Sequence, residues 1–305
     1  MKEKLIFSDY KERCSKLGLI LTNLERITPT QEKKILELEQ RKIDSVENPK
    51  LKLTKNMTNE LYSLIAQRDS DDVLPTGATS HLDEVFRSVF WKRKRDLSNK
   101  FLEKGLLTEQ DILNIAGKVD NDFYLANQES FETDFIKGKW DNFKDKVRDV
   151  KSNYDLKSFE EADLSTLYKS QLNGYSVMLK EMHQLDHYPI GELIYGLVNN
   201  PLHHINNEIT RQFYALGNPN DDNDKWIETK RQIERNMIFD IKKFKDEYPH
   251  YHFENKNLDF DIPEILRVKK FDVLTTENDE YHIKRRVLMS RVYLCNKEIE
   301  VYNKL

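Results

Sequence analysis

The chain is poor in cysteine, has no long apolar run and carries no excess of positive charge. Its 305 residues include 2 cysteines, Cys14 and Cys295, too few for a disulfide framework or a four-thiolate metal or cluster site. No stretch approaches the roughly 20 apolar residues that span a bilayer, so we expect no membrane partner and no targeting segment. The net charge of -4 argues against coating nucleic acid by bulk attraction. We expect a reduced, cytoplasmic protein.

Charged and aromatic residues are plentiful instead. Charged residues make up 33% of the chain and aromatic residues 10%, which is polar for a globular protein but sufficient for a core. Local basic runs occur at Trp91 to Arg95, Lys242-Lys243 and Lys284 to Arg286. A solvated helix face is the ordinary explanation of such runs. Phosphate contact is the functional one, through Arg93 and Arg95 in the densest run.

Apolar periodicity predicts helices around one β-rich stretch. Residues up to about 70 favour two or three short helical pieces, and a long helix is expected from about Ser80 to Lys104. Gly105 is expected to interrupt it, and a second helix follows with Glu109 in its first turn. Residues 123 to 151 turn aromatic and β-branched, which predicts three or four short antiparallel strands as the sheet core.

Helical spacing dominates the rest of the chain. Ser158 fits the start of a capping box, and in the apolar pattern that follows Gln171 and Tyr175 share one helix face. Further helices are expected over residues 190–216, 226–245 and from about 279, with a strand over 267–274. We predict an α+β, α/β/α-like fold with a small mixed central sheet flanked by helices. Its expected parts are a helical N-terminal region (1–75), a core (76–190) and a mostly helical C-terminal extension packed on that core (191–305).

Asp149 and Lys151 lie on one face of a predicted strand. The side-chain period of two puts Val147, Asp149 and Lys151 together, and one tight turn brings Asp141 near them. Carboxylates suit Mg²⁺, and a lysine with a depressed pKa beside them could orient or deprotonate an attacking water. Phosphodiester hydrolysis needs charge stabilisation, an activated water and a neutralised leaving group. The order of these residues therefore indicates a metal-dependent nuclease.

Four motifs carry a resemblance to a known family. They are Lys104-Gly105 before Glu109, Gly138-Lys139-Trp140-Asp141, Asp149-Val150-Lys151-Ser152, and Gln171-Leu172-Asn173-Gly174-Tyr175. From about Phe101 to Leu179 the chain resembles the PD-(D/E)XK nuclease superfamily, in particular the phage-type recombination exonucleases of the lambda-exonuclease-like branch. It departs from the family pattern in having Trp140 where proline often stands and Asp149 where glutamate is also common. Neither departure removes a ligand.

The resemblance implies a restriction-endonuclease-like core and a role for each matching residue. The implied metal set for Mg²⁺ or Mn²⁺ is Glu109, Asp141, Asp149 and Val150. Lys151 would position the nucleophile, and Gln171, Tyr175 and Ser152 would support the site or touch DNA. The implied partners are DNA, a single-strand annealing recombinase and further copies of the chain, in the host cytoplasm if a phage encodes it.

Several alternatives stay open at this point. Glu103, Glu129 or Glu132 could replace Glu109 as the upstream carboxylate. The same catalytic residues would serve a structure- or sequence-specific endonuclease, and the fold could belong to an inactive DNA-binding or assembly protein. In a purely structural role, Asp149 and Lys151 would form a strand-end salt bridge.

The histidines suggest a different metal site. His183 and His187 are four positions apart on a predicted helix, His203-His204 and His250/His252 are close pairs, and His81 could reach the active site. A zinc site is the more specific of the two hypotheses for these histidines. A predicted helix end at Tyr188-Pro189 and the lack of an adjacent third ligand favour exposed or packed histidines.

Overall fold

A four-stranded mixed sheet organises the chain. The computed structural model describes residues 4–21, 29–48, 51–69, 74–93, 99–220 and 223–304. The strand order is β4-β5-β6-β7, with β5 and β6 parallel and each outer pair antiparallel. The strands are β4 (Asn142–Phe143), β5 (Val147–Ser152), β6 (Gly191–Gly196) and β7 (Val268–Val273). The antiparallel β4 and β5 and the strand β7 confirm three of the predicted strands.

The central strand β6 contradicts the prediction of a helix beginning at residue 190. All residues of β6 are buried, because it lies between β5 and β7 and both of its faces are covered. Such a strand has a nearly continuous apolar sequence, whose period does not distinguish it from a buried helix. The helix of this segment, α8 (Leu202–Ala215), starts only after Pro201.

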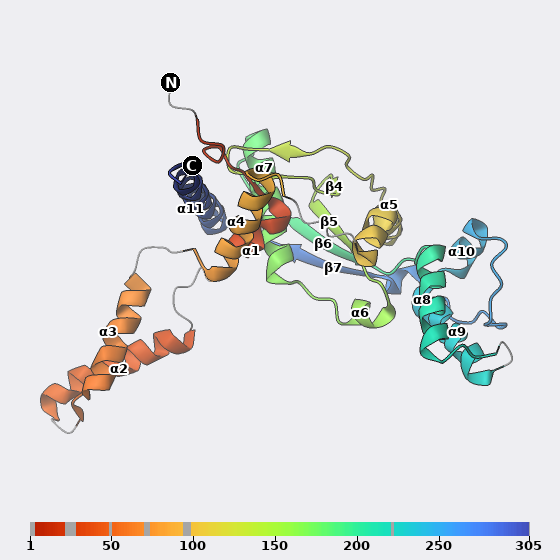
Figure 1. Ribbon diagram of the computed structural model, residues 1–305, viewed down its shortest axis with the longest axis horizontal. Coiled ribbons are helices and arrows are strands. Elements are labelled where there is room, and N and C mark those ends of the chain that lie inside the picture. The colour runs from red at the N-terminus through yellow and green to blue at the C-terminus, as the bar shows by residue number, and fades with distance from the viewer. Residues whose placement is uncertain are drawn as a thin grey trace.

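Two helices cover opposite faces of the sheet (Figure 1). Val150 and Ile194 pack against Ile112 of α5 (Lys100–Asp120). Val147 and Leu193 point the other way and share a core with α7 (Thr166–His183). Asp149 and Lys151 have the parity of Val147, so they lie on the α7 face. The predicted strand faces and the predicted helix around Gln171 and Tyr175 are therefore confirmed.

A second, three-stranded sheet brings the N-terminus to the core. Its strand order is β1-β3-β2, with β1 parallel to β3. The strands are β1 (Glu12–Arg13), β2 (Phe131–Glu132) and β3 (Ile136–Gly138), and η1 (Cys14–Lys16) and α1 (Leu17–Ile20) follow β1. A Cβ on Gly174 of α7 would meet the end of the Leu17 side chain, so α1 packs closely on α7 at this position. The segments η1 and α1, which follow β1, thus belong to the packed core. The predicted domain boundary at residue 75 stays a prediction.

The expected long helix from Ser80 to Lys104 is wrong, and two helices take its place. α4 (Thr76–Val89) ends before Lys92, whose φ of 53° is incompatible with a continuing right-handed helix. Asn99 caps α5 by accepting hydrogen bonds from the Phe101 and Leu102 N–H groups. Gly105 lies within α5 rather than interrupting it, and Glu109 lies near the middle of α5 rather than in a first turn.

One capping prediction and one helix prediction also need correction. α6 (Leu156–Glu160) is capped by Asp155, and Ser158 is the third helical residue of that capping box instead of its first member. The expected helix over 226–245 is two helices, α9 (Asp224–Met237) and α10 (Ile241–Glu247). The Asp240 side chain accepts a hydrogen bond from Lys243 N–H and starts α10, which breaks the helical path.

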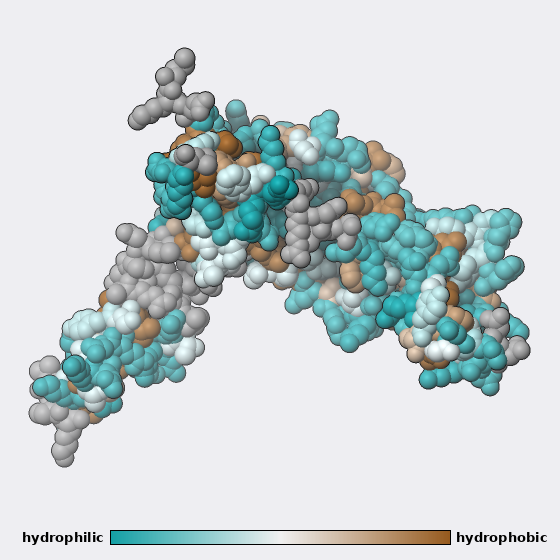
Figure 2. Space-filling model, viewed as in Figure 1, coloured by the Kyte–Doolittle hydropathy of each residue, from teal (hydrophilic) through white to brown (hydrophobic). Residues whose placement is uncertain are grey.

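The remaining helices lie outside the central sheet. The final helix, α11 (Glu277–Tyr302), confirms the prediction from about 279 and follows η3 (Glu264–Leu266) and β7. Figure 1 shows α2 (Pro29–Glu47) and α3 (Lys55–Asp69) as an arm on one side and α8, α9 and α10 grouped at the other end. The face in Figure 2 is mainly hydrophilic, with small separate hydrophobic patches. None of the described helices is long and apolar enough to cross a bilayer.

Candidate active site

Asp149 is a buried carboxylate held from two sides. Its side chain is 3% exposed, and Gln171 Nε2 on α7 donates a 2.6 Å hydrogen bond to its Oδ1. The Lys151 ammonium forms an ion pair with Oδ2 from the same face of β5. The two residues predicted to act together are therefore in direct contact.

Gln171 and Tyr175 form a supporting chain of hydrogen bonds. Gln171 Nε2 lies 2.8 Å from the Tyr175 hydroxyl, which donates a 2.7 Å hydrogen bond to the Lys139 carbonyl. A Cβ on Gly138 would lie 2.8 Å from Tyr175 Cε1, so the tyrosine ring reaches Lys139 because residue 138 is glycine. This chain fixes both the Asp149 carboxylate and the segment leading to Asp141.

Asp141 is bound to the backbone of β5. Its Oδ2 accepts a 2.7 Å hydrogen bond from Val150 N–H, and its own N–H donates to the Arg148 carbonyl at 3.0 Å. The preceding Trp140 is buried and stacks on Phe131 with ring centroids 4.5 Å apart. Tryptophan in place of the proline of the family pattern thus anchors the turn by packing.

The end of β5 is attached to α5, which carries Glu109. The buried Lys104 Nζ donates to the Asn153 carbonyl at 2.5 Å, and Thr108 Oγ1 donates to Ser152 Oγ at 3.1 Å. Glu109 Oε1 lies 4.0 Å from Lys139 Nζ. Ser152 therefore supports the position of α5 beside the carboxylates.

The contacts of the four candidate glutamates show which one can serve as the upstream carboxylate of the site. Glu103 contacts two histidines, and Glu132 pairs with Lys11 at 2.9 Å on the surface. Glu129 is exposed, whereas Glu109 is close enough for its charge to raise the pKa of Asp141 and for the Asp149 charge to raise the pKa of Glu109. Glu109 is thus the member of this set that accompanies the two aspartates.

Burial and the Asp149 charge raise the pKa values of Asp141 and Glu109. Burial and then the Asp149 charge raise the pKa of Asp141 to about 8. Burial is also the main cause that raises the pKa of Glu109, with a further contribution from Asp149. Burial lowers the pKa of Lys151, but Asp149 and Asp141 outweigh it and the net direction is upward. These neighbours therefore raise the pKa of Lys151, and the depressed pKa expected for a lysine near a bound metal stays a prediction.

In the chelated protein, we expect Asp141→Asn to raise the free energy of unfolding more at pH 8 than at pH 5. A folded-state pKa above the ordinary 3.8 means that stability is lost as the pH rises from about 4 to about 8. Asparagine does not ionise and still accepts the Val150 N–H. The difference should be on the order of a few kcal/mol. Thermal unfolding with EDTA at both pH values measures it, and equal effects would contradict it. Asp186→Asn, an exposed aspartate, is the control.

The donor set fits a divalent cation. The Asp149 charge acts on both Asp141 and Glu109, and the buried Asp149 Oδ2 has no hydrogen-bond partner in the described part of the chain beyond its ion pair with Lys151. Mg²⁺ and Mn²⁺ prefer such oxygen donors and would relieve the repulsion that raises these pKa values. Val150 contributes its N–H to Asp141; its role as a metal ligand stays a prediction.

Three described residues of the basic runs contact groups other than the site carboxylates. Arg93 is exposed and its backbone N–H bonds to Arg87, while Arg95 lies outside the described residues. Lys243 pairs with Asp111 and Lys284 with Glu280. His81 contacts Glu12 at 3.1 Å rather than the carboxylates. Phosphate contact by Arg93 and Arg95 stays a prediction.

Sequence reasoning missed three residues around the site. Lys139 faces Glu109, Lys104 fastens α5, and the Tyr168 ring lies 5.1 Å from Lys151 Nζ. Burial lowers the pKa of Lys104 to about 7, although Asp155 acts in the opposite direction. Lys104 and Lys139 lie within the quoted motifs, so the signal was present. Tyr168 stands one helical turn before Gln171 and could have been found from that spacing.

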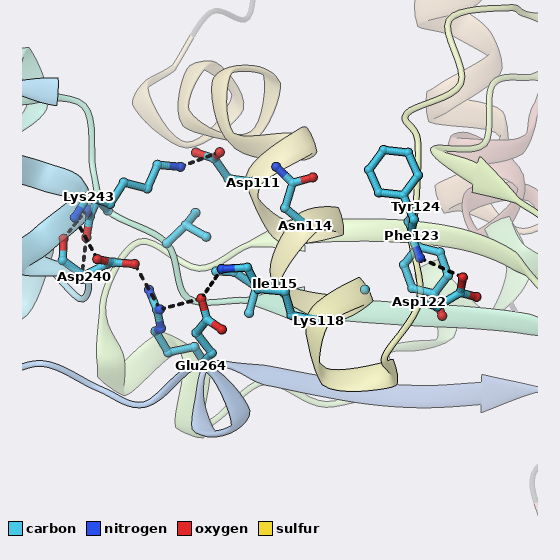
Figure 3. A pocket seen from close by; sticks show the side chains of 14 residues that line it. Asp111, Asn114, Ile115, Lys118, Asp122, Phe123, Tyr124, Asp240, Lys243 and Glu264 are labelled. Carbon is cyan, nitrogen blue, oxygen red and sulfur yellow. Dashed lines mark hydrogen bonds and ion pairs between the residues drawn. The ribbon is translucent and has the colours of Figure 1, made fainter. Parts of the chain in front are cut away.

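Figure 3 shows a pocket on the other side of α5. Asp111 and Lys118 face it, and both lie about 180–200° around the helix from Glu109, at 100° per residue. Lys243 pairs with Asp111 at 2.5 Å and Lys118 with Glu264 at 2.6 Å. Because Asp111 and Glu264 are each paired with a lysine at this pocket, it does not offer the carboxylate donors that the centre around Asp149 offers.

The protein is thus a mixed α+β chain. Its central sheet carries carboxylates and a lysine at a site between α5 and α7. The same fold occurs in the crystal structure of a phage-related exonuclease from Haemophilus somnus 129PT. The two chains are 16% identical with a TM-score of 0.56, over 96% of this chain and 97% of that one. This likeness shows that the two chains share a fold. No family model and no curated protein matches the chain.

Proposed function

We propose that this protein is a metal-dependent DNA nuclease that hydrolyses phosphodiester bonds, and that it acts as an exonuclease in phage-type recombination or DNA processing. The observation that carries the proposal is the direct contact of Asp149 with Lys151 on one strand face, with Asp141 bonded to the Val150 N–H of that strand and Glu109 near enough for the Asp149 charge to raise its pKa. The fold shared with a phage-related exonuclease adds support. DNA is the proposed substrate; an annealing recombinase, homo-oligomers and a cytoplasmic location stay predictions.

The three carboxylates, with Val150, would hold Mg²⁺ or Mn²⁺, which supplies charge stabilisation and a more acidic water when bound. Gln171 keeps the Asp149 carboxylate in one orientation through Oδ1 and leaves Oδ2 toward Lys151. The Tyr175 hydroxyl contacts Gln171 and donates a hydrogen bond to the Lys139 carbonyl, two residues before Asp141, which holds Gln171 in place. These residues therefore preorganise the oxygen donors, which is where electrostatic catalysis gains most.

Lys151 begins as a cation, because Asp149 and Asp141 raise its pKa. It can orient a water or a phosphate oxygen as a hydrogen-bond donor. It could accept a proton only after first releasing its own, which the contacts with Asp149 and Asp141 disfavour. Positioning is therefore better supported than general-base action.

The site is accessible from one side. The Lys151 side chain is 26% exposed and the Lys139 side chain 33%, while Asp149 is 3% exposed. An approaching phosphate would meet the two ammonium groups before the deepest carboxylate. Two lysines at the entrance suit an anionic substrate even though the whole chain is acidic.

The decisive experiment compares linear with closed-circular duplex DNA. The purified chain is incubated with each DNA in Mg²⁺, in Mn²⁺ and in chelator. We expect metal-dependent loss of linear DNA alone. Cutting of circles would favour an endonuclease instead, and no cutting of either form would favour an inactive DNA-binding protein on the same fold.

A further inference from the structure

A second cluster of metal-binding side chains lies outside the nuclease site. Glu103 Oε1 lies 3.1 Å from His203 Nε2, and Glu103 Oε2 lies 3.1 Å from His204 Nε2. Their ligand atoms all lie within 4.8 Å of one another. We propose that Glu103, His203 and His204 form a Zn²⁺ site that joins the start of α5 to the start of α8.

The distances suit a common ion. Two ligand atoms bound about 2.0–2.1 Å from a tetrahedral zinc are about 3.3 Å apart. Each histidine nitrogen is already 3.1 Å from a Glu103 oxygen, so small side-chain rotations would place an ion between them. Two histidines and one glutamate leave a fourth position open for water.

The surrounding structure positions two of the proposed ligands, His204 and Glu103. The Asn200 side chain donates to the Tyr154 carbonyl at 2.9 Å and to the Met237 carbonyl at 3.1 Å, which fixes the chain just before α8. His204 is buried, with its ring 6.0 Å from that of Tyr154. Glu103 lies in the first turn of α5, where the helix dipole favours an ionised carboxylate.

The cluster is open to an incoming ion. The side chains of His203 and Glu103 are 50% and 53% exposed, against 2% for His204. A buried ligand with two accessible ones gives an anchored site with an entry path. His204 Nδ1 has no hydrogen-bond partner among the residues described, so Glu103 provides the polar contact that orients this ring.

The chemistry separates this site from the carboxylate centre. Imidazole nitrogens select zinc and related transition ions, whereas Mg²⁺ prefers oxygen donors. Glu103 and Glu109 are six positions apart on α5, which is about 9 Å of helix rise. Zinc would therefore bind beside the nuclease site without sharing its ligands. It would fasten α8 to the helix that carries Glu109.

The test is a metal titration of the full-length protein. After chelation and dialysis, the protein is titrated with Zn²⁺ against a chromophoric competitor, and with Co²⁺ followed by its visible absorption. Glu103→Gln and His203→Ala alter exposed ligands, which avoids emptying the buried His204 position. His252→Ala changes an exposed histidine elsewhere, and Asp149→Asn changes the nuclease site. Circular dichroism checks that each variant is folded.

We expect one Zn²⁺ per chain, resistant to millimolar Mg²⁺ and retained by both controls. Glu103→Gln and His203→Ala should bind at least about 100-fold more weakly, since even outer-shell changes weaken metal sites 10–100-fold. Absence of stoichiometric zinc in the parent protein would overturn the proposal. So would parent-like affinity in the folded ligand variants, or loss confined to Asp149→Asn, which would put zinc at the nuclease centre.

Discussion

Asp149→Asn is expected to abolish DNA hydrolysis and Mn²⁺ binding at the carboxylate centre. Asp149 is the deepest of the three carboxylates and contacts both Gln171 and Lys151. Asparagine has the same shape and can still accept the Gln171 hydrogen bond, so the fold should persist. The amide lacks the charge that a divalent cation needs. We expect the DNA cleavage rate to fall at least about 10³-fold.

Two measurements check this result. The initial rate of linear DNA loss gives the activity, and a Mn²⁺ titration followed by electron paramagnetic resonance gives the binding. Asp186→Asn removes one exposed negative charge outside the four motifs and should leave both unchanged. A fully active Asp149→Asn protein would show that the metal site has been misplaced.

Lys151→Ala is expected to lower the cleavage rate about 10²–10⁴-fold while Mn²⁺ binds no more weakly than in the parent. The ammonium faces Asp149 from the same strand face and neutralises part of the carboxylate charge. Removing it takes away the group that positions the nucleophile but leaves every proposed ligand in place. The loss should therefore appear in turnover rather than in metal affinity.

Lys151→Arg distinguishes two roles of this residue. Arginine keeps the positive charge but does not release a proton at accessible pH, so it can position a water but cannot act as a base. Partial recovery of the rate in Lys151→Arg would support positioning by charge. The exposed Lys256→Ala serves as the control. Unchanged turnover in Lys151→Ala would remove Lys151 from the mechanism.

Local periodicity was sufficient for some of the site. Alternation along β5 placed Asp149 and Lys151 on one face, and helical spacing placed Gln171 and Tyr175 together on α7. These patterns depend on residues within a few positions of each other. The break between α4 and α5 was not foreseen, because the apolar spacing continues across it although Lys92 leaves the helical conformation.

Long-range packing decided the rest. Glu109 could not be separated from Glu103 by sequence, since both precede the strands and lie on α5. The packing of α5 against β5 puts one beside Asp149, and the packing of α8 puts the other beside His203. The third ligand that we propose for the histidine pair is thus Glu103, a residue 100 positions before His203.

By itself the sequence determined the faces of β5 and α7, the strand β7, the helix α11 and the ordered motifs of a nuclease-like site, because each follows from local side-chain period or spacing. Only the tertiary structure decided that Gly191–Gly196 is a central strand, because burial on both faces removes the alternation that marks a strand. It also decided which carboxylates meet. Contacts between distant segments depend on how helices pack on the sheet, and no local pattern records that.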